Sequence, residues 1–244
     1  MTLEVYLRSG PVFLATTLLL PARSRGLGVV FSHGWGGTHA FDDLLRALAG
    51  WGVTVASIQQ RGYGRSTGKP ALAAWPRDMA AAGEWLRQRG LHPWVMGVST
   101  GGTMALVAAG RYPWLAGAIA LSPFATLRLM ERTYPPARKD LTARFGRLRP
   151  VDYATADAVT WGAKIAPRPA LVLHARHDPT TPLAHAERLR DEAGLPLHVL
   201  PGRDHWFETA DRTALLARIR ATLARGPATR RRPPAGPGAK VRRP

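Results

Sequence analysis

Short apolar runs alternate with amphipathic segments along almost the whole 244-residue chain. Strands that alternate with helices of about 10 to 15 residues pack as a parallel sheet with helices on both faces. The sequence therefore predicts a doubly wound α/β fold with a mostly parallel, eight-stranded sheet. No helical pattern separates the first two strands, so we expect them to form an antiparallel edge joined at Gly10-Pro11. The expected strands are residues 3–7, 12–20, 27–32, 53–58, 93–98, 116–121, 170–174 and 197–200, and the expected helices are residues 40–49, 76–89, 103–111, 183–193 and 211–224.

One segment breaks this alternation. Residues 124–169 lie between two expected core strands and are polar, rich in Arg and interrupted by Pro. We expect them to form a small inserted lid over the strand ends, where open α/β sheets bind their ligands. The alternative is a solvated helical excursion that does not touch a substrate. From residue 226 onward Pro, Gly and Arg dominate, so we expect one domain over residues 1–225 and a disordered basic tail over residues 226–244.

The chain carries a formal net charge of +18, a property shared by many nucleic-acid-binding proteins. Only four of its 34 basic residues are Lys, however, and six of the 34 lie in the tail. The others are spread along the chain without a dense block or an aromatic–basic RNA motif. We therefore expect weak, salt-sensitive attraction to polyanions and no specific nucleic-acid partner.

No cysteine occurs in the chain, which excludes a disulfide, a thiolate metal site and a cysteine nucleophile. Residues 1–10 lack the basic start and apolar run of a secretion signal. The apolar stretch 12–20 is shorter than the roughly 20 residues that a membrane-spanning helix needs. We expect a soluble, cytoplasmic protein with no membrane partner, and the sequence leaves its oligomeric state open.

The run GVSTGG at residues 97–102 follows one expected strand and precedes an expected helix. A Ser on a sharp strand-to-helix turn needs small neighbours two positions away on either side, and Gly97 and Gly101 provide them. Such a turn presents the Ser99 hydroxyl to solvent at a helix N-terminus, where backbone N–H groups stabilise negative charge. The motif thus favours acyl transfer through Ser99. Taken alone in a chain with 25 Gly, it is equally compatible with an ordinary N-cap Ser.

A Ser nucleophile needs a base to accept its proton and an acid to orient that base. Asp178 follows the seventh expected strand and His205 follows the eighth, so both lie in loops beyond the carboxyl ends of strands. We take Asp178 as the candidate acid and His205 as the candidate base. Three other carboxylates remain alternative acids: Asp152, Asp157 and, with less support because it is adjacent to the base, Asp204.

The Gly-rich run HGWGGT at residues 33–38 follows the third expected strand. Its backbone can aim an N–H group at a substrate oxygen, and the N–H groups of Trp35 and Thr100 would then form a two-donor oxyanion hole. We expect His33 to support this turn structurally, since it precedes the nucleophile and lies at the wrong strand to be the base.

We expect neither a metal nor a nucleotide cofactor. His174 and His177 are three residues apart at a strand end, where they face opposite sides, and no third ligand is evident. The run STGK at residues 66–69 matches S-x-x-K, but the chain has no K-T-G partner. Pro70 also follows where a helix would have to continue.

Five motifs resemble those of the α/β-hydrolase superfamily: HGWGGT at 33–38, QRGYGRSTG at 60–68, GVSTGG at 97–102, HARHDPTTP at 174–182 and GRDHWF at 202–207. Within it, the chain is similar to the esterase, dienelactone-hydrolase-like and serine-aminopeptidase-like branch, over roughly residues 3–225. The resemblance implies an α/β-hydrolase fold and a triad in the chain order Ser99, Asp178, His205. One position departs from it, because Gln59 stands where such proteins often have an Asp that braces the loop.

Together these observations predict a cofactor-independent serine hydrolase that forms an acyl-enzyme. The expected substrate is a small-molecule carboxylic ester with an aliphatic or aromatic acyl group, which would suit Trp35, Trp206 and the lid residues Tyr134 and Phe145. A serine peptidase of the aminopeptidase type or a thioesterase is the alternative enzyme. Outside enzymes, the alternative is a non-catalytic binding scaffold that keeps this fold.

Overall fold

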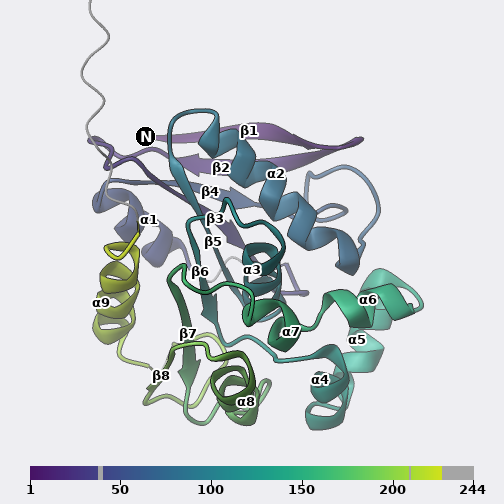
Figure 1. Ribbon diagram of the computed structural model, residues 1–244. Coiled ribbons are helices and arrows are strands. Elements are labelled where there is room, and N and C mark those ends of the chain that lie inside the picture. Colours follow the sequence, from purple (N-terminus) through teal and green to yellow (C-terminus); the bar gives the residue numbers. More distant parts are fainter. Residues whose placement is uncertain (38–40, 209, 227–244) are drawn as a thin grey trace, which may run out of the picture.

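The computed structural model describes residues 1–37, 41–208 and 210–226 (Figure 1). Every strand expected from the sequence is present, and the predicted mostly parallel α/β architecture is confirmed. Thr38 of the Gly-rich run, Ala40 of the first expected helix and the predicted tail beyond Gly226 lie outside the described residues. The strands are β1 (Thr2–Ser9), β2 (Val12–Leu19), β3 (Leu27–Ser32), β4 (Val53–Ile58), β5 (His92–Val98), β6 (Gly117–Leu121), β7 (Ala170–Ala175) and β8 (Leu197–Leu200).

The eight strands form one sheet in the order β1-β2-β4-β3-β5-β6-β7-β8. β2 runs antiparallel to both β1 and β4, whereas all the other neighbours are parallel. The predicted turn at Gly10-Pro11 joins the first pair, and it places Ser9 opposite Val12. Because parallel strands end at the same edge of a sheet, the loops after β3, β5, β7 and β8 all open onto that edge.

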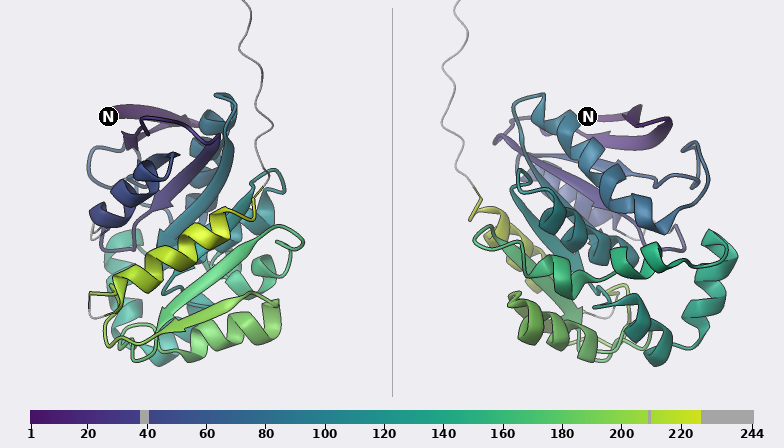
Figure 2. Two further views of the ribbon diagram at one scale, coloured as in Figure 1. Left: turned by 90° about the vertical axis from the view of Figure 1, so that its left-hand side faces the viewer. Right: turned by 45° about the vertical axis from the view of Figure 1, so that its right-hand side comes forward.

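Helices cover both faces of the sheet, as Figure 2 shows. Side chains of neighbouring strand residues point to opposite faces, so one strand contributes to both cores. Val30 packs in the core with α2 (Trp75–Arg87) and α3 (Thr100–Arg111), whereas Val29 and Phe31 pack in the core with α1 (Asp42–Gly50) and α9 (Arg212–Leu223). No described helix is both long and apolar enough to cross a lipid bilayer. The helix layers also contain α8 (Ala184–Ala193), and a short 3-10 helix η1 (Leu72–Ala74) precedes α2.

Residues 124–169 include four short helices: α4 (Leu127–Thr133), α5 (Pro136–Phe145), α6 (Pro150–Thr155) and α7 (Ala158–Gly162). The last of them packs closely on α3. A Cβ atom added to Gly110 would lie 2.1 Å from the carbonyl oxygen of Trp161, so a residue larger than Gly could not be accommodated there. In Figure 1, α4, α5 and α6 stand to one side of the sheet. The segment therefore has two parts, with α7 in the helix layer and α4 to α6 beyond it.

Candidate active site

Ser99 lies between β5 and α3 in a strained backbone conformation. Its φ is 55° and its ψ is −123°, outside the regions that residues with a side chain normally adopt. The glycines on either side are required, as the sequence predicted. A Cβ atom at Gly97 would lie 2.5 Å from the carbonyl carbon of Gly101, and one at Gly101 would lie 2.3 Å from the carbonyl oxygen of Ser32. The tight packing of two backbone segments thus holds Ser99 in this turn.

Ser99 is less open to solvent than the sequence predicted, because only 4% of the residue is exposed. The loop after β3 and the loop after β8 both come close to it. The Cβ position of Gly34 lies 3.7 Å from Oγ of Ser99 and 3.7 Å from Cη2 of Trp206. Trp206 follows His205 directly, so the candidate nucleophile and the loop that carries the candidate base meet at Gly34.

Asp178 and His205, from the loops after β7 and β8, lie side by side. Nδ1 of His205 donates a 2.7 Å hydrogen bond to Oδ2 of Asp178. The other carboxylate oxygen accepts from the backbone N–H groups of Thr180 and Thr181, each at 2.8 Å. Burial by itself raises the pKa of Asp178, but the hydrogen bond and charge of His205 and the Thr181 N–H outweigh it, and the net pKa is lowered. The carboxylate is therefore ionised at neutral pH, and Nε2 is the His205 nitrogen left to accept a proton.

A buried histidine supports the loop that carries Asp178. Nε2 of His174 donates to the carbonyl oxygen of Thr181 at 2.7 Å and lies 3.8 Å from Oδ2 of Asp178. Burial lowers the pKa of His174, so the ring is neutral at neutral pH. Its Nδ1 has no hydrogen-bond partner among the described residues. Within the same part of the chain, no group of three His, Cys, Asp or Glu side chains is placed to hold a metal ion.

The three alternative acids have partners of their own. Oδ1 of Asp204 accepts from the backbone N–H groups two and four residues further on, and so shapes the turn that carries His205. Asp157 caps the N-terminus of α7. Asp152 accepts from the backbone at the start of α6 and from the backbone of η1. Asp178 is therefore the carboxylate that the structure pairs with the His205 imidazole.

Trp35 and Thr100, the two expected oxyanion donors, lie in the segments that follow β3 and β5. Thr100 is the first residue of α3, so its N–H has no intrahelical acceptor. The carbonyl oxygen of Trp35 accepts a 2.8 Å hydrogen bond from the hydroxyl of Tyr63, whose pKa is raised by burial. Nδ1 of His33 donates to the carbonyl oxygen of Gly34 at 2.7 Å, consistent with the supporting role expected for it. Hydrogen bonds thus fix the turn on both sides of the Trp35 N–H.

Gln59, which departs from the motif expected at this position, braces the loop that follows it. Its Oε1 accepts a 2.8 Å hydrogen bond from the N–H of Arg65, and its carbonyl oxygen accepts a 2.6 Å bond from the hydroxyl of Ser66. A Cβ atom at Gly64 would lie 2.2 Å from Oε1, so the amide packs directly on the turn. The departure from the motif leaves the loop hydrogen-bonded.

Aromatic side chains connect the inserted helices to these loops. The ring of Tyr134, just after α4, lies 6.5 Å from the ring of Trp35. Phe145, at the end of α5, lies 6.5 Å from Tyr63 and 5.9 Å from Trp75. The insertion therefore touches both Trp35 and the tyrosine that holds its carbonyl group.

His185 of α8, which the sequence alone does not single out, binds the insertion from the opposite side. Its Nδ1 accepts from the N–H of Ala125 at 3.1 Å, and its Nε2 lies 2.8 Å from Oγ1 of Thr133. Burial lowers the pKa of His185 to about 4, so the imidazole is neutral at physiological pH. Both partners are 52 or more residues away in sequence, and no local pattern marks such a contact.

The strand order, the strained Ser after β5 and the Asp–His pair after β7 and β8 define an α/β hydrolase. Residues 24–158 match the family described as serine aminopeptidase, S33. This match covers more than half of the chain, and the protein belongs to that family of hydrolases.

The chain is also similar to individual proteins, in part of its sequence or in its fold. A thermostable monoacylglycerol lipase from Bacillus sp. (strain H-257) is 30% identical over 105 residues, which are 41% of this chain and 42% of the lipase, so the chain matches less than half of that relative's length. An esterase from Pyrococcus furiosus superposes with a TM-score of 0.77 over 92% of this chain and 90% of its own, at 16% identity. A proline iminopeptidase from Mycobacterium smegmatis superposes with a TM-score of 0.69 over 91% of this chain and 98% of its own, at 17% identity. The 16% and 17% identities of these two structures show a common fold and do not show a common activity.

Proposed function

We propose that this hydrolase cleaves carboxylic esters of small molecules through an acyl-enzyme formed on Ser99. The proposal is carried by one observation, the 2.7 Å hydrogen bond between His205 and Asp178. It joins two loops that open onto the same sheet edge as the strained Ser99 turn. An ordinary N-cap Ser needs neither the strained backbone nor a paired imidazole in a neighbouring loop.

In the proposed mechanism, Oγ of Ser99 attacks the acyl carbon while Nε2 of His205 accepts its proton. Asp178 stabilises the resulting imidazolium through the Nδ1–H bond. The imidazolium then gives the proton to the departing alcohol as the ester C–O bond breaks, which leaves the acyl group on Ser99. Water attacks this acyl group, passes its proton to His205, and releases the carboxylic acid as Ser99 recovers its hydrogen.

The N–H groups of Trp35 and Thr100 are the proposed donors to the tetrahedral oxyanion. The positive end of the α3 dipole adds to the Thr100 contribution. Loss of one such donor typically lowers turnover by about 10²- to 10³-fold. Because Tyr63 and His33 hold the carbonyl groups on either side, the Trp35 N–H is fixed before a substrate arrives.

For the substrate, we favour an aliphatic or aromatic acyl group bound among the rings of Trp35, Tyr134 and Trp206. α4 to α6 act as the lid in this proposal, which their contacts with Trp35 and Tyr63 support. The lipase and esterase among the relatives support an ester bond. A peptidase is the second candidate. The description of the matching family names a serine aminopeptidase, and a proline iminopeptidase has a similar fold. A cytoplasmic location and independence from nucleic acid remain predictions from the sequence.

A panel of p-nitrophenyl esters, acyl-CoA thioesters and aminoacyl p-nitroanilides, assayed with the native protein and with Ser99→Ala, tests the bond type and the nucleophile together. We expect the native protein to hydrolyse the nitrophenyl esters fastest and Ser99→Ala to be inactive on all three classes. Cleavage of the anilides alone would make the protein a peptidase. Ester hydrolysis that survives in Ser99→Ala would remove Ser99 from the mechanism.

A further inference from the structure

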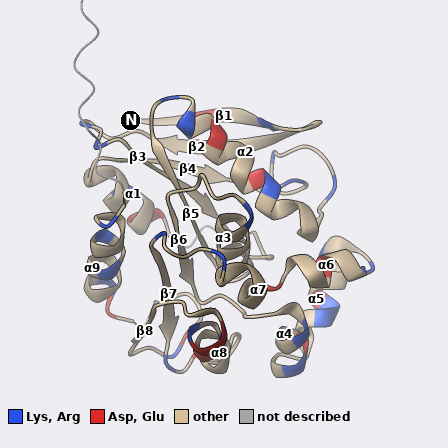
Figure 3. Cartoon of the chain, in the orientation of Figure 1, with Lys and Arg blue, Asp and Glu red and all other residues tan. Residues whose placement is uncertain are grey.

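One open space among the described residues lies apart from the candidate catalytic side chains. It is a cavity of about 880 Å³ that is open to solvent and bordered by α4, α5, α6 and α8. Arg128 and Arg132 of α4, Arg138 of α5 and Arg188 of α8 line it, together with Tyr153 of α6. Figure 3 shows the basic residues of α4 and α5 at the side of the molecule where this cavity lies.

α4 separates the cavity from the core of the protein. Leu127 and Met130 on one face of the helix are fully buried in the apolar core. Arg128 and Arg132, on the other face, line the cavity. Tyr134 directly follows the helix, and its ring lies 6.5 Å from the ring of Trp35. The cavity lining thus contains none of Ser99, Asp178 and His205.

Three of the arginines that line this cavity have no carboxylate partner among the described residues. Elsewhere in the described chain, Arg side chains often bind carboxylates directly, as Arg61 and Arg87 do. Within the same described residues, Arg128, Arg132 and Arg138 form no salt bridge, and Arg128 instead stacks 5.0 Å above the ring of Tyr153. Three guanidinium groups thus face one concave space without a carboxylate partner.

Two acidic groups also lie at the cavity wall, and each accepts hydrogen bonds from neutral donors. Glu131 accepts a 2.9 Å hydrogen bond from the hydroxyl of Tyr153. Asp157 uses both carboxylate oxygens on the N–H and hydroxyl of Thr160. Arg188 is paired with Glu192 outside the cavity lining. Four arginines and two carboxylates therefore line the cavity, and its net positive charge attracts a ligand of the opposite sign.

We propose that this cavity binds a small polyanion that carries at least two phosphoryl or carboxylate groups. Planar guanidinium groups bind both kinds of anion through paired hydrogen bonds. The volume lies within the range of about 300 to 1,000 Å³ that is typical of small-molecule sites. The proposal concerns a site separate from the Ser99 chemistry and does not depend on ester hydrolysis.

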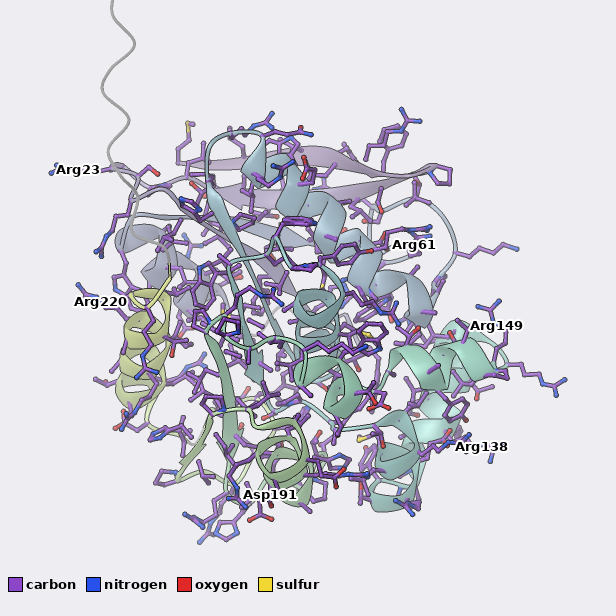
Figure 4. The ribbon with its side chains drawn as sticks, in the orientation of Figure 1. Arg23, Arg61, Arg138, Arg149, Asp191 and Arg220 are labelled. Atoms are coloured by element: carbon purple, nitrogen blue, oxygen red, sulfur yellow. The ribbon has the colours of Figure 1, made fainter. Side chains whose placement is uncertain are left out.

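Isothermal titration with pyrophosphate and with citrate, at one fixed ionic strength, tests the site directly. The test variant is the double substitution Arg132→Gln with Arg138→Gln. The matched control is Arg23→Gln with Arg220→Gln, which removes the same charge from exposed positions on the side of the molecule opposite Arg138 (Figure 4). We expect the native protein to bind at least one of the anions with one-to-one stoichiometry. The cavity variant should bind it about tenfold or more weakly, and the control should bind within about twofold of the native protein.

Tighter binding of pyrophosphate would assign the site to phosphoryl compounds, and tighter binding of citrate would assign it to carboxylates. An equal loss of affinity in both double variants would mean that the overall charge of +18 attracts the anions, which would overturn the proposal. The absence of saturable binding with either anion in the millimolar range would overturn it as well. Circular dichroism of the two variants verifies that both remain folded, as expected for substitutions at exposed side chains.

Discussion

The sheet edge with Ser99, Asp178 and His205 and the inserted helices α4 to α6 are held in place by different forces. At the sheet edge, backbone groups hold the side chains, as the two N–H groups on Asp178 and the tight glycine packing under Ser99 show. In the insertion, the contacts toward the site are made by side chains such as Tyr134 and Phe145. A catalytic array needs positional precision, which buried backbone contacts supply. Substitutions in the insertion should therefore affect the candidate site less than substitutions at the sheet edge.

The largest effect should come from the acid at the sheet edge. We expect Asp178→Asn to lower kcat for a nitrophenyl ester by about 10³- to 10⁴-fold, because the His205 imidazole loses both its orientation and its counter-charge. The insertion offers a matched control in Asp152→Asn, which removes an equally buried carboxylate. The two variants are compared by steady-state kinetics. If Asp152→Asn proved the more damaging, the acid would belong to the insertion.

His185 of α8 is hydrogen-bonded to Ala125 and Thr133 of the inserted segment. We expect this contact between α8 and the insertion to be sensitive to acid. The pKa of His185 is about 4 in the folded protein and about 6.5 when unfolded, so between these values the unfolded chain binds more protons. The free energy of unfolding should therefore fall as the pH drops through this window, by up to roughly 3 kcal/mol from this residue. Protonated Nδ1 could no longer accept from the Ala125 N–H.

Urea unfolding at pH 7 and near pH 4.5 measures this dependence. His185→Gln should flatten it, since an amide can keep one donor and one acceptor without titrating. His177→Gln, at an exposed position on the loop after β7, serves as the control and should keep the dependence of the native protein. An unchanged dependence in His185→Gln would show that the contact between insertion and α8 is not acid-sensitive.

A smaller effect should follow when the support behind Asp178 is removed. His174→Phe keeps the apolar volume but leaves the Thr181 carbonyl without its hydrogen bond, so the Asp178 loop should shift. We expect kcat to fall on the order of 10- to 100-fold with KM nearly unchanged. His174→Gln, which retains an N–H donor, should restore part of the loss. Equal kinetics in both variants would mean that the hydrogen bond does not position the acid.

The smallest effect is expected from the removal of a single tyrosine hydroxyl, at Tyr63 or at Tyr153. Tyr63→Phe removes the bond to the Trp35 carbonyl and should lower kcat/KM by a few-fold, equivalent to about 1 kcal/mol. Tyr153→Phe removes a similar bond within the insertion, to Glu131, and should leave ester hydrolysis unchanged. A larger loss in Tyr153→Phe than in Tyr63→Phe would show that the insertion positions the catalytic groups.

The contrast between the sheet edge and the inserted helices also explains which features could be predicted from the sequence. Strand positions follow from local apolar patterns, and the loops after β7 and β8 carry Asp178 and His205 wherever those strands pair. α3 begins at Thr100 and not at the expected residue 103, because packing on the sheet outweighs the low helix propensity of its first glycines. The support from His174 depends on a contact that forms only when the chain has folded.

The insertion was expected as a unit, but its helices were not predicted one by one. Local signals for them exist. Thr126 and Asp157 cap α4 and α7 through their side chains, and Pro136 and Pro150 open α5 and α6. These helices are too short to show a clear apolar period. Their placement depends on distant partners such as His185, which no local pattern reveals.

The central claim is that Ser99 is an activated nucleophile, and covalent labelling tests it most directly. A fluorophosphonate probe is added to the native protein and to Ser99→Ala, and the labelled residue is located by mass spectrometry of the digested chains. We predict one phosphonyl group on Ser99 of the native protein and none on the variant. A folded native protein that stays unlabelled, or that carries the label on another residue, would contradict the account.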